Sequence, residues 1–142
     1  MSAKEYLANI RRYNNQVSML KQRKLSIVET LTNIAPNYDS MPRSATRNVH
    51  KMEELICAKI DLDNEIAELT LAVELIMKTI SSLPKADHCE LLAERYANNQ
   101  SWRSIAKILN LSESRVFHLH REALDELARQ IKRDRKTVVN SS

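Results

Sequence analysis

The chain has 142 residues, no glycine, three prolines and a formal net charge of +4 at pH 7. Because tight hairpins and phosphate-cradling loops depend on glycine, this composition excludes glycine-loop nucleotide sites and predicts an all-α fold. With one Trp, one Phe and four Tyr a large globular core is not expected, and the modest positive charge is compatible with nucleic-acid binding.

Two long segments, residues 3–34 and 48–83, each predict a helix. Apolar residues recur along both segments at alternating steps of three and four, which is heptad spacing, with one polar break in each stripe, at Lys24 and Lys59. Residues 35–47 between them contain two prolines with Asn, Asp and Ser, which predicts a loop. We therefore expect a long, coiled-coil-like antiparallel helical hairpin over residues 1–84.

The register of this hairpin brings two like charges together. If the chain folds back near Met41, residue i faces residue 83 − i, and the basic first helix lies along the acidic second helix. The same register places Lys24 near Lys59, where like charges repel. Two resolutions stay open: the register is off by a turn, or both lysine stems lie along the seam with their charged ends in water, helped by Asp61 and Asp63.

The hairpin also has apolar and charged surfaces that a partner could cover. Apolar residues lie off the main stripe of the second helix, at Ile56, Ile60, Leu71 and Leu75. Two helices bury little by themselves, so a second copy, the C-terminal domain or a partner protein is expected to cover them, and a homo-oligomer is our first expectation. In the loop, a residue among Ser44, Thr46 and Asn48 can cap the second helix, or Arg43 and Arg47 can contact a partner.

Residues 85–131 predict three shorter helices. Asp87, with Glu90 three residues later, is expected to cap the first. Ser101 and Ser112 are expected to cap the next two, and Asn110 stands in the turn between them, where the backbone is expected to be left-handed. Polar residues 132–142 are expected to form a frayed or disordered tail.

Within this region, two capped helices and a tight turn form a helix-turn-helix pattern. An apolar face on each helix, with the small Ala106 at the crossing, allows close approach: Trp102, Ile105, Ala106 and Leu109 on one, and Val116, Leu119, Ala123 and Leu124 on the other. Such a crossing can present the N-terminal residues of the second helix to a DNA major groove.

The residues that carry this pattern resemble region 4 of bacterial sigma factors, which reads the promoter −35 element. The matching words, within Glu94–Leu127, are Ser101-Trp102-x-x-Ile105-Ala106-x-x-Leu109 and Ser112-x-x-Arg115-Val116-x-x-Leu119-His120-x-x-Ala123-Leu124. Over its whole length the chain is similar to a family of small bacteriophage proteins that join a helical N-terminal part to a sigma-like helix-turn-helix. The resemblance implies regulation of phage transcription.

The chain also departs from the sigma pattern. Asn110 replaces the turn glycine, the base-reading surface carries different side chains, and the region that opens the −10 element is missing. These departures favour an activator or repressor over a complete sigma factor.

The second helix of the motif, over residues 112–130, is predicted to read the major groove. The outward residues near its start are predicted to contact base edges: Glu113, Ser114, Phe117 and His118. Basic residues and the helix N-terminus are predicted to contact phosphates: Arg103, Lys107, Ser112, Arg115 and Arg121.

Other chemistries have weaker signals. No catalytic constellation is present, so an enzyme is not expected, and neither is a cofactor. His118 and His120 lie two apart, which does not place them on one helix face, and no cysteine pair has zinc-finger spacing, so no metal is expected. Trp102 is expected to anchor the core. The unrelated contexts of Cys57 and Cys89, with no apolar signal region and no stretch of membrane-spanning length, favour a cytoplasmic protein and no membrane partner. The resemblance to phage proteins implies that the cell is a bacterial host.

The sequence therefore predicts a sequence-specific DNA-binding transcription regulator of phage or prophage genes. Its expected partners are double-stranded DNA and a second copy of itself, and it would act through host RNA polymerase or by occupying a promoter. One alternative is a phage DNA-packaging protein, like the small terminase subunits, or an assembly protein. Another is a protein-interaction module that binds polymerase without DNA, which would show no salt-dependent DNA affinity.

Overall fold

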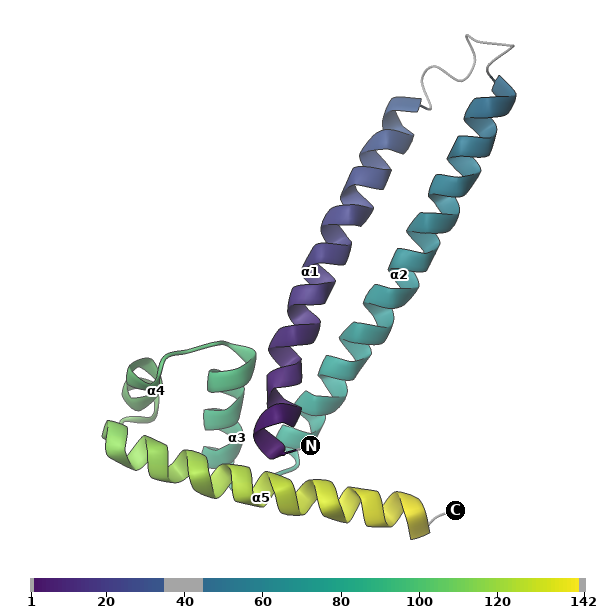
Figure 1. Ribbon diagram of the computed structural model, residues 1–142. Helices are drawn as coiled ribbons and strands as arrows, with labels where there is room; N and C mark the ends of the chain where they lie inside the picture. Colours follow the sequence, from purple (N-terminus) through teal and green to yellow (C-terminus); the bar gives the residue numbers. More distant parts are fainter. Residues whose placement is uncertain (1, 35–44, 141–142) are drawn as a thin grey trace. The chain divides into compact units, whose positions relative to one another are not determined.

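The computed structural model describes residues 2–34 and 45–140, and every regular element in these two ranges is helical (Figure 1). This confirms the all-α prediction. The helices are α1 (Ala3–Ile34), α2 (Ala45–Ser81), α3 (Ala86–Leu92), α4 (Trp102–Leu109) and α5 (Glu113–Asn140), with a π-helical turn, η2 (Ala93–Ala97), between α3 and α4. None of the described helices has the length and apolar character needed to cross a membrane. The side chains of the predicted 35–47 loop lie outside the described residues.

The chain divides into two compact units. The first, which we call the core unit, consists of Met1–Tyr13 and Ala72–Ser142. The second, the helix-pair unit, consists of Asn14–Leu71. The predicted boundary at residue 84 falls inside the core unit, because the end of α2 contributes buried side chains to its core.

The core unit has one apolar core. In Figure 1, α3 and α4 both pack on α5, and the start of α1 and the end of α2 add side chains to the same cluster. Fully burying one Leu or Ile side chain stabilises a fold by roughly 1.5–3 kcal/mol, so this cluster is the main source of stability in the unit. Its buried members are Leu7, Ile10, Ile76, Ile80, Leu83, Leu91, Leu92, Ile105, Ala106, Val116, Leu119, Ala123 and Leu127.

The start of α3 differs from the predicted one. The first helical hydrogen bond runs from the Cys89 N–H to the carbonyl oxygen of Lys85, at 3.3 Å, so Lys85 is the N-cap residue. No side chain caps this helix, and Asp87 lies inside its first turn, so the predicted Asp87 cap is wrong. The Cys89 thiol donates to the carbonyl oxygen of Ile80, at 3.1 Å.

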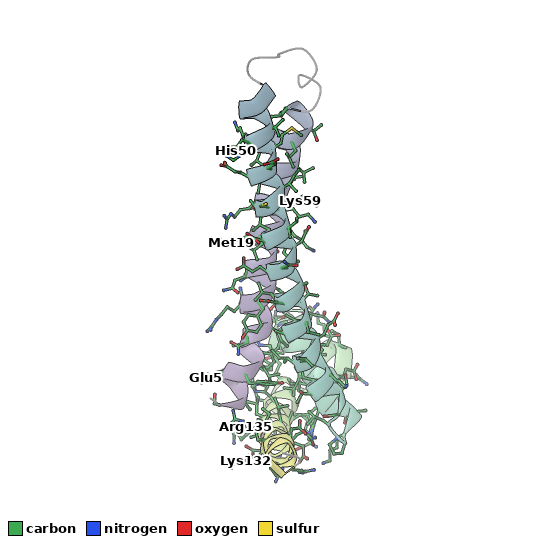
Figure 2. All side chains as sticks on the ribbon, turned by 90° about the vertical axis from the view of Figure 1, so that its right-hand side faces the viewer. Glu5, Met19, His50, Lys59, Lys132 and Arg135 are labelled. Carbon is green, nitrogen blue, oxygen red and sulfur yellow. The ribbon has the colours of Figure 1, made fainter. Side chains whose placement is uncertain are left out.

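The last helix is longer than predicted. We expected a frayed tail from residue 132, but α5 continues to Asn140, so that expectation is wrong for this stretch. Ion pairs along the helix support the extension: the Glu126 carboxylate lies 3.0 Å from the guanidinium of Arg129, one turn later, and 3.5 Å from that of Arg133, two turns later. Lys132 and Arg135 are exposed on this part of α5 (Figure 2).

In the helix-pair unit, Leu20 of α1 and Leu62 of α2 are buried. The ammonium groups of Lys24 and Lys59 contact one carboxylate, that of Asp63, at 2.6 and 3.4 Å, and Figure 2 shows Lys59 on α2. The hydrogen bond from Lys24 is the main cause that lowers the pKa of Asp63. Asp63 therefore bridges the two lysines, as one of the two open resolutions anticipated.

The contacts between α1 and α2 also fit the other open resolution, a register displaced by about a turn. Lys24 contacts Asp63, which lies four residues beyond the partner expected for it. In the core unit, the Tyr6 hydroxyl donates to Thr79 Oγ1 at 3.1 Å, two residues beyond its expected partner. Each contact is displaced in the same direction along α2 by up to one helical turn. The shared carboxylate explains why the displaced register is tolerated in the helix-pair unit, since it separates two charges that would otherwise repel.

Candidate nucleic-acid interface

The connection between α4 and α5 is built from local hydrogen bonds. The Ser101 hydroxyl accepts from the Ser104 N–H at 3.1 Å and so caps α4, as predicted. The helix ends at Asn110, which has φ 56° and ψ 47°. This left-handed conformation confirms the prediction, and Asn is one of the few residues other than glycine that adopts it readily. Leu111 and Ser112 then lead from this left-handed residue into α5.

The start of α5 is capped in the same way as the start of α4. The Ser112 hydroxyl accepts from the Arg115 N–H at 3.2 Å, which confirms the predicted cap. Behind it, Val116 and Leu119 turn into the apolar core, where Ile105 and Ala106 of α4 are also buried. The buried residues fix which face of α5 is turned outward.

The outward face of α5 carries the residues predicted to contact bases. Positions separated by three, four and seven residues share one side of a helix, so Ser114, Phe117, His118 and Arg121 lie together there. All four are exposed, and so is Glu113 at the helix start. Three of the four residues predicted to contact bases thus share one exposed face with Arg121, and the fourth, Glu113, is exposed at the start of the same helix.

Three of these side chains also have protein partners. The Glu113 carboxylate lies 3.7 Å from the Arg103 guanidinium. The His118 Nε2 atom lies 2.9 Å from the Glu122 carboxylate. The Phe117 ring lies 5.3 Å from the Trp102 ring, although 46 % of the residue stays exposed. These contacts hold the side chains in defined orientations, which reduces the entropy that binding would cost.

The residues predicted to contact phosphates surround this surface. Lys107, Arg115 and Arg121 are exposed, and none of them forms an ion pair within the described residues. Arg103 is paired with Glu113, and the Ser112 hydroxyl is occupied by its capping bond. Arg103 and Lys107 also line a shallow hollow beside the turn, with a volume of about 510 Å³.

An aromatic cluster beside this surface was only partly anticipated. Trp102 packs against the core, as expected of an anchor, and its ring lies 4.7 Å from the ring of His120. The Arg95 guanidinium stacks on the same Trp102 ring, 4.2 Å from its centre. Nothing in the spacing links Arg95 to Trp102, because an irregular turn separates them.

His120 belongs to this cluster and not to the outward face. Its Nε2 atom forms a 2.9 Å hydrogen bond with the Tyr96 hydroxyl. Burial, aided by the charges of Lys4 and Arg95, lowers the pKa of His120 to about 4, and burial raises the pKa of Tyr96. Both groups are therefore neutral at pH 7, and His120 adds no positive charge to the candidate interface.

A second histidine is almost completely enclosed. His88 is 3 % exposed, and its Nε2 atom lies 3.7 Å from the carboxylate of Glu122, the residue that also holds His118. Burial tends to raise the pKa of Glu122, but His118 and His88 are among the groups that outweigh it and lower that pKa. Sequence spacing did not reveal this link from α3 to α5. Neither ring nitrogen of His88 forms a hydrogen bond among the described residues, so its link to Glu122 is a proximity of charge and not a hydrogen bond.

The candidate interface is thus a capped helix start with polar, aromatic and basic side chains on one exposed face. Within the described part of the chain, no group of three or more His, Cys, Asp or Glu side chains is arranged to hold a metal ion. No protein-family model, no curated protein and no solved structure matches this chain.

Proposed function

We propose that this protein is a sequence-specific DNA-binding transcription regulator. In this proposal residues 85–131 act as a helix-turn-helix, and α5 enters the major groove with its N-terminal end. The observation that carries the proposal is the exposed face of α5 over Ser114, Phe117 and His118, which follows two capped helix starts and a left-handed turn. A major groove is wide enough to admit one α-helix, and base edges there are distinguishable.

Each side chain on this face has a chemical role in the proposal. Ser114 and His118 hydrogen-bond base edges, and Glu113 accepts from a cytosine amine. Phe117 contacts a thymine methyl group with its exposed side. Phosphates are contacted by a surrounding set of donors: Arg103, Lys107, Arg115, Arg121 and the N-terminus of α5 at Ser112.

The biological setting comes from the resemblance to sigma region 4 and to small phage regulators. It supports control of phage or prophage genes in the bacterial cytoplasm, through host RNA polymerase or by occupying a promoter.

We also propose that residues 1–84 form an antiparallel helical hairpin that pairs with a second copy of the chain. Apolar side chains on the helix-pair unit are accessible: Ile56 is 44 % exposed, Ile60 is 51 % and Leu71 is 55 %. Covering them with a second copy removes apolar surface from water. A two-fold dimer would bind half-sites about 34–36 Å apart, or a multiple of that distance, so its DNA sites would be palindromic.

The test is selection of binding sites from a random duplex pool, followed by salt titration on the selected sequence. We expect a defined site and a steep decrease of affinity with salt. Replacing Arg115 with Ala should weaken binding to all sequences and reduce the salt slope by about one, whereas His118→Ala should change the preferred sequence. Lys51→Ala, an exposed charge on the helix-pair unit, is the control and should change neither.

The other outcomes distinguish the alternatives. If no sequence is enriched and light scattering shows a ring of many copies, the protein is a packaging or assembly protein. If DNA affinity is absent and the full chain binds purified host polymerase, the sigma-like domain is a protein-interaction module.

A further inference from the structure

A hollow with a positively charged lining lies in the core unit beside the turn that follows η2. Its volume is about 200 Å³, and its lining residues come from α1 and from the 95–99 segment. Two of them are arginines and none is acidic: Ala8, Arg11, Arg95, Tyr96 and Asn99. Ala8 lies one turn before Arg11 on α1, and its small side chain leaves the space open.

Arg95 is held in place before any ligand arrives. Its Nη1 atom donates to the carbonyl oxygen of Gln100 at 3.0 Å, and its guanidinium stacks on the Trp102 ring. The adjoining turn is itself fixed, because Asn99 has φ 55° and the Gln100 N–H donates to the Glu94 carbonyl oxygen at 2.9 Å. A guanidinium has five N–H donors, so donors of Arg95 remain for a ligand.

Arg11 supplies the second charge. It is exposed, and no carboxylate pairs with it or with Arg95 among the residues that the structure describes. Two cations that share one hollow repel each other unless an anion lies between them. The low pKa of His120 shows the same positive surroundings, since Lys4 and Arg95 both add to the effect of burial on that residue.

We propose that this hollow binds a phosphate group between the guanidinium groups of Arg11 and Arg95. A guanidinium matches the geometry of phosphate oxygens with two parallel hydrogen bonds, which lysine does not offer. The phosphate can come from the DNA backbone or from a free phosphate or phosphate ester. The first source rests on the proposed DNA-binding function.

The contacts around Arg95 favour the DNA backbone. Arg95 stacks on Trp102, and Trp102 contacts Phe117 on the exposed face of α5. A duplex bound to that face would therefore pass close to the hollow. Arg11 would then add a DNA contact from α1, outside the helix-turn-helix segment.

The experiment compares Arg11→Gln with Arg12→Gln in the full chain. Both residues are exposed neighbours on α1 and both changes remove one positive charge, but only Arg11 lines the hollow. Because Arg11 is exposed, its replacement should leave the fold intact, and the helical circular dichroism of both variants checks this. Two quantities are measured: the melting temperature in inorganic phosphate against chloride at equal ionic strength, and the affinity for duplex DNA as a function of salt.

We expect phosphate to raise the melting temperature of the wild type and of Arg12→Gln, but not of Arg11→Gln. We also expect Arg11→Gln to weaken DNA binding roughly three- to fivefold at constant salt and to lower the salt slope by about one, with a smaller effect of Arg12→Gln. A phosphate effect without a DNA effect assigns the hollow to free phosphate or its esters. A DNA effect alone assigns it to the backbone.

The proposal is overturned if the two variants behave alike in both measurements. That result leaves the DNA-binding function untouched, because wild-type affinity and site selection test it separately. Conversely, if the wild type binds phosphate through Arg11 but has no affinity for DNA, the proposed phosphate site stands and the proposed DNA-binding function fails.

Discussion

The core unit and the helix-pair unit use the same residue types in different ways. In the core unit, Ile105 of α4 is completely buried because helices cover it from several sides. In the helix-pair unit, Ile60 of α2 lies off the main apolar stripe and is 51 % exposed. The same residue type is therefore buried or exposed according to how many neighbouring helices cover its position. A unit made from two helices leaves much of its apolar surface available to a partner.

The largest expected change in stability is found by comparing the same substitution, Ile to Ala, in both units. Ile105→Ala should lower the free energy of unfolding by about 2–5 kcal/mol, because it removes buried methyl groups and leaves a cavity. Ile60→Ala should lower it by about 0.5 kcal/mol or less in a monomer, as for other surface changes. Urea unfolding, monitored by circular dichroism, measures both.

Protein concentration makes this pair of variants more informative. If a second copy covers Ile60, its substitution should destabilise the protein more as concentration rises, and sedimentation should show a weaker dimer. An Ile60→Ala effect that equals that of Ile105→Ala at every concentration would contradict the contrast between the units.

A smaller loss of stability is expected from substitutions in the turn between α4 and α5. This turn of the core unit has no counterpart among the described residues of the helix-pair unit. Asn110→Ala should lower the free energy of unfolding by about 1 kcal/mol, because alanine adopts the left-handed region at a steric cost that Asn partly avoids. Asn110→Gly should change the free energy of unfolding by only a few tenths of the alanine effect, since glycine adopts the left-handed region without steric cost. Equal losses for both variants would show that the Asn side chain, and not its backbone, matters here.

A further effect in the core unit is a pH dependence of stability that comes from His120. The pKa of His120 is about 4 in the folded protein and near 6.5 when unfolded, so the unfolded chain takes up the proton first. The stabilisation from neutral His120 is therefore complete above pH 6.5 and is lost as the pH falls through 4. Melting temperatures between these values should fall less steeply in His120→Gln than in the wild type. His50→Gln, an exposed histidine of the helix-pair unit, should follow the wild type.

Much of the local structure could be predicted because it depends on residues close together in the chain. The helix over residues 3–34, the Ser101 and Ser112 caps and the left-handed Asn110 all result from interactions within about one turn. For the same reason the exposed face of α5 followed from its apolar spacing, which put Val116 and Leu119 inside. The two wrong predictions also concern local structure. The helix α3 begins before Asp87, so Asp87 is not its cap, and the polar residues after 131, which predicted a frayed tail, continue α5 to Asn140.

The sequence by itself determined that this protein is helical, where its turns lie and which side of α5 faces outward. Only the tertiary structure decided that Asp63 bridges Lys24 and Lys59, and that Arg11 and Arg95 line one hollow. The physical reason is that periodicity and capping act between neighbours along the chain. Ion pairs and charged hollows form between residues that only packing brings together, and small displacements in register change which of them meet.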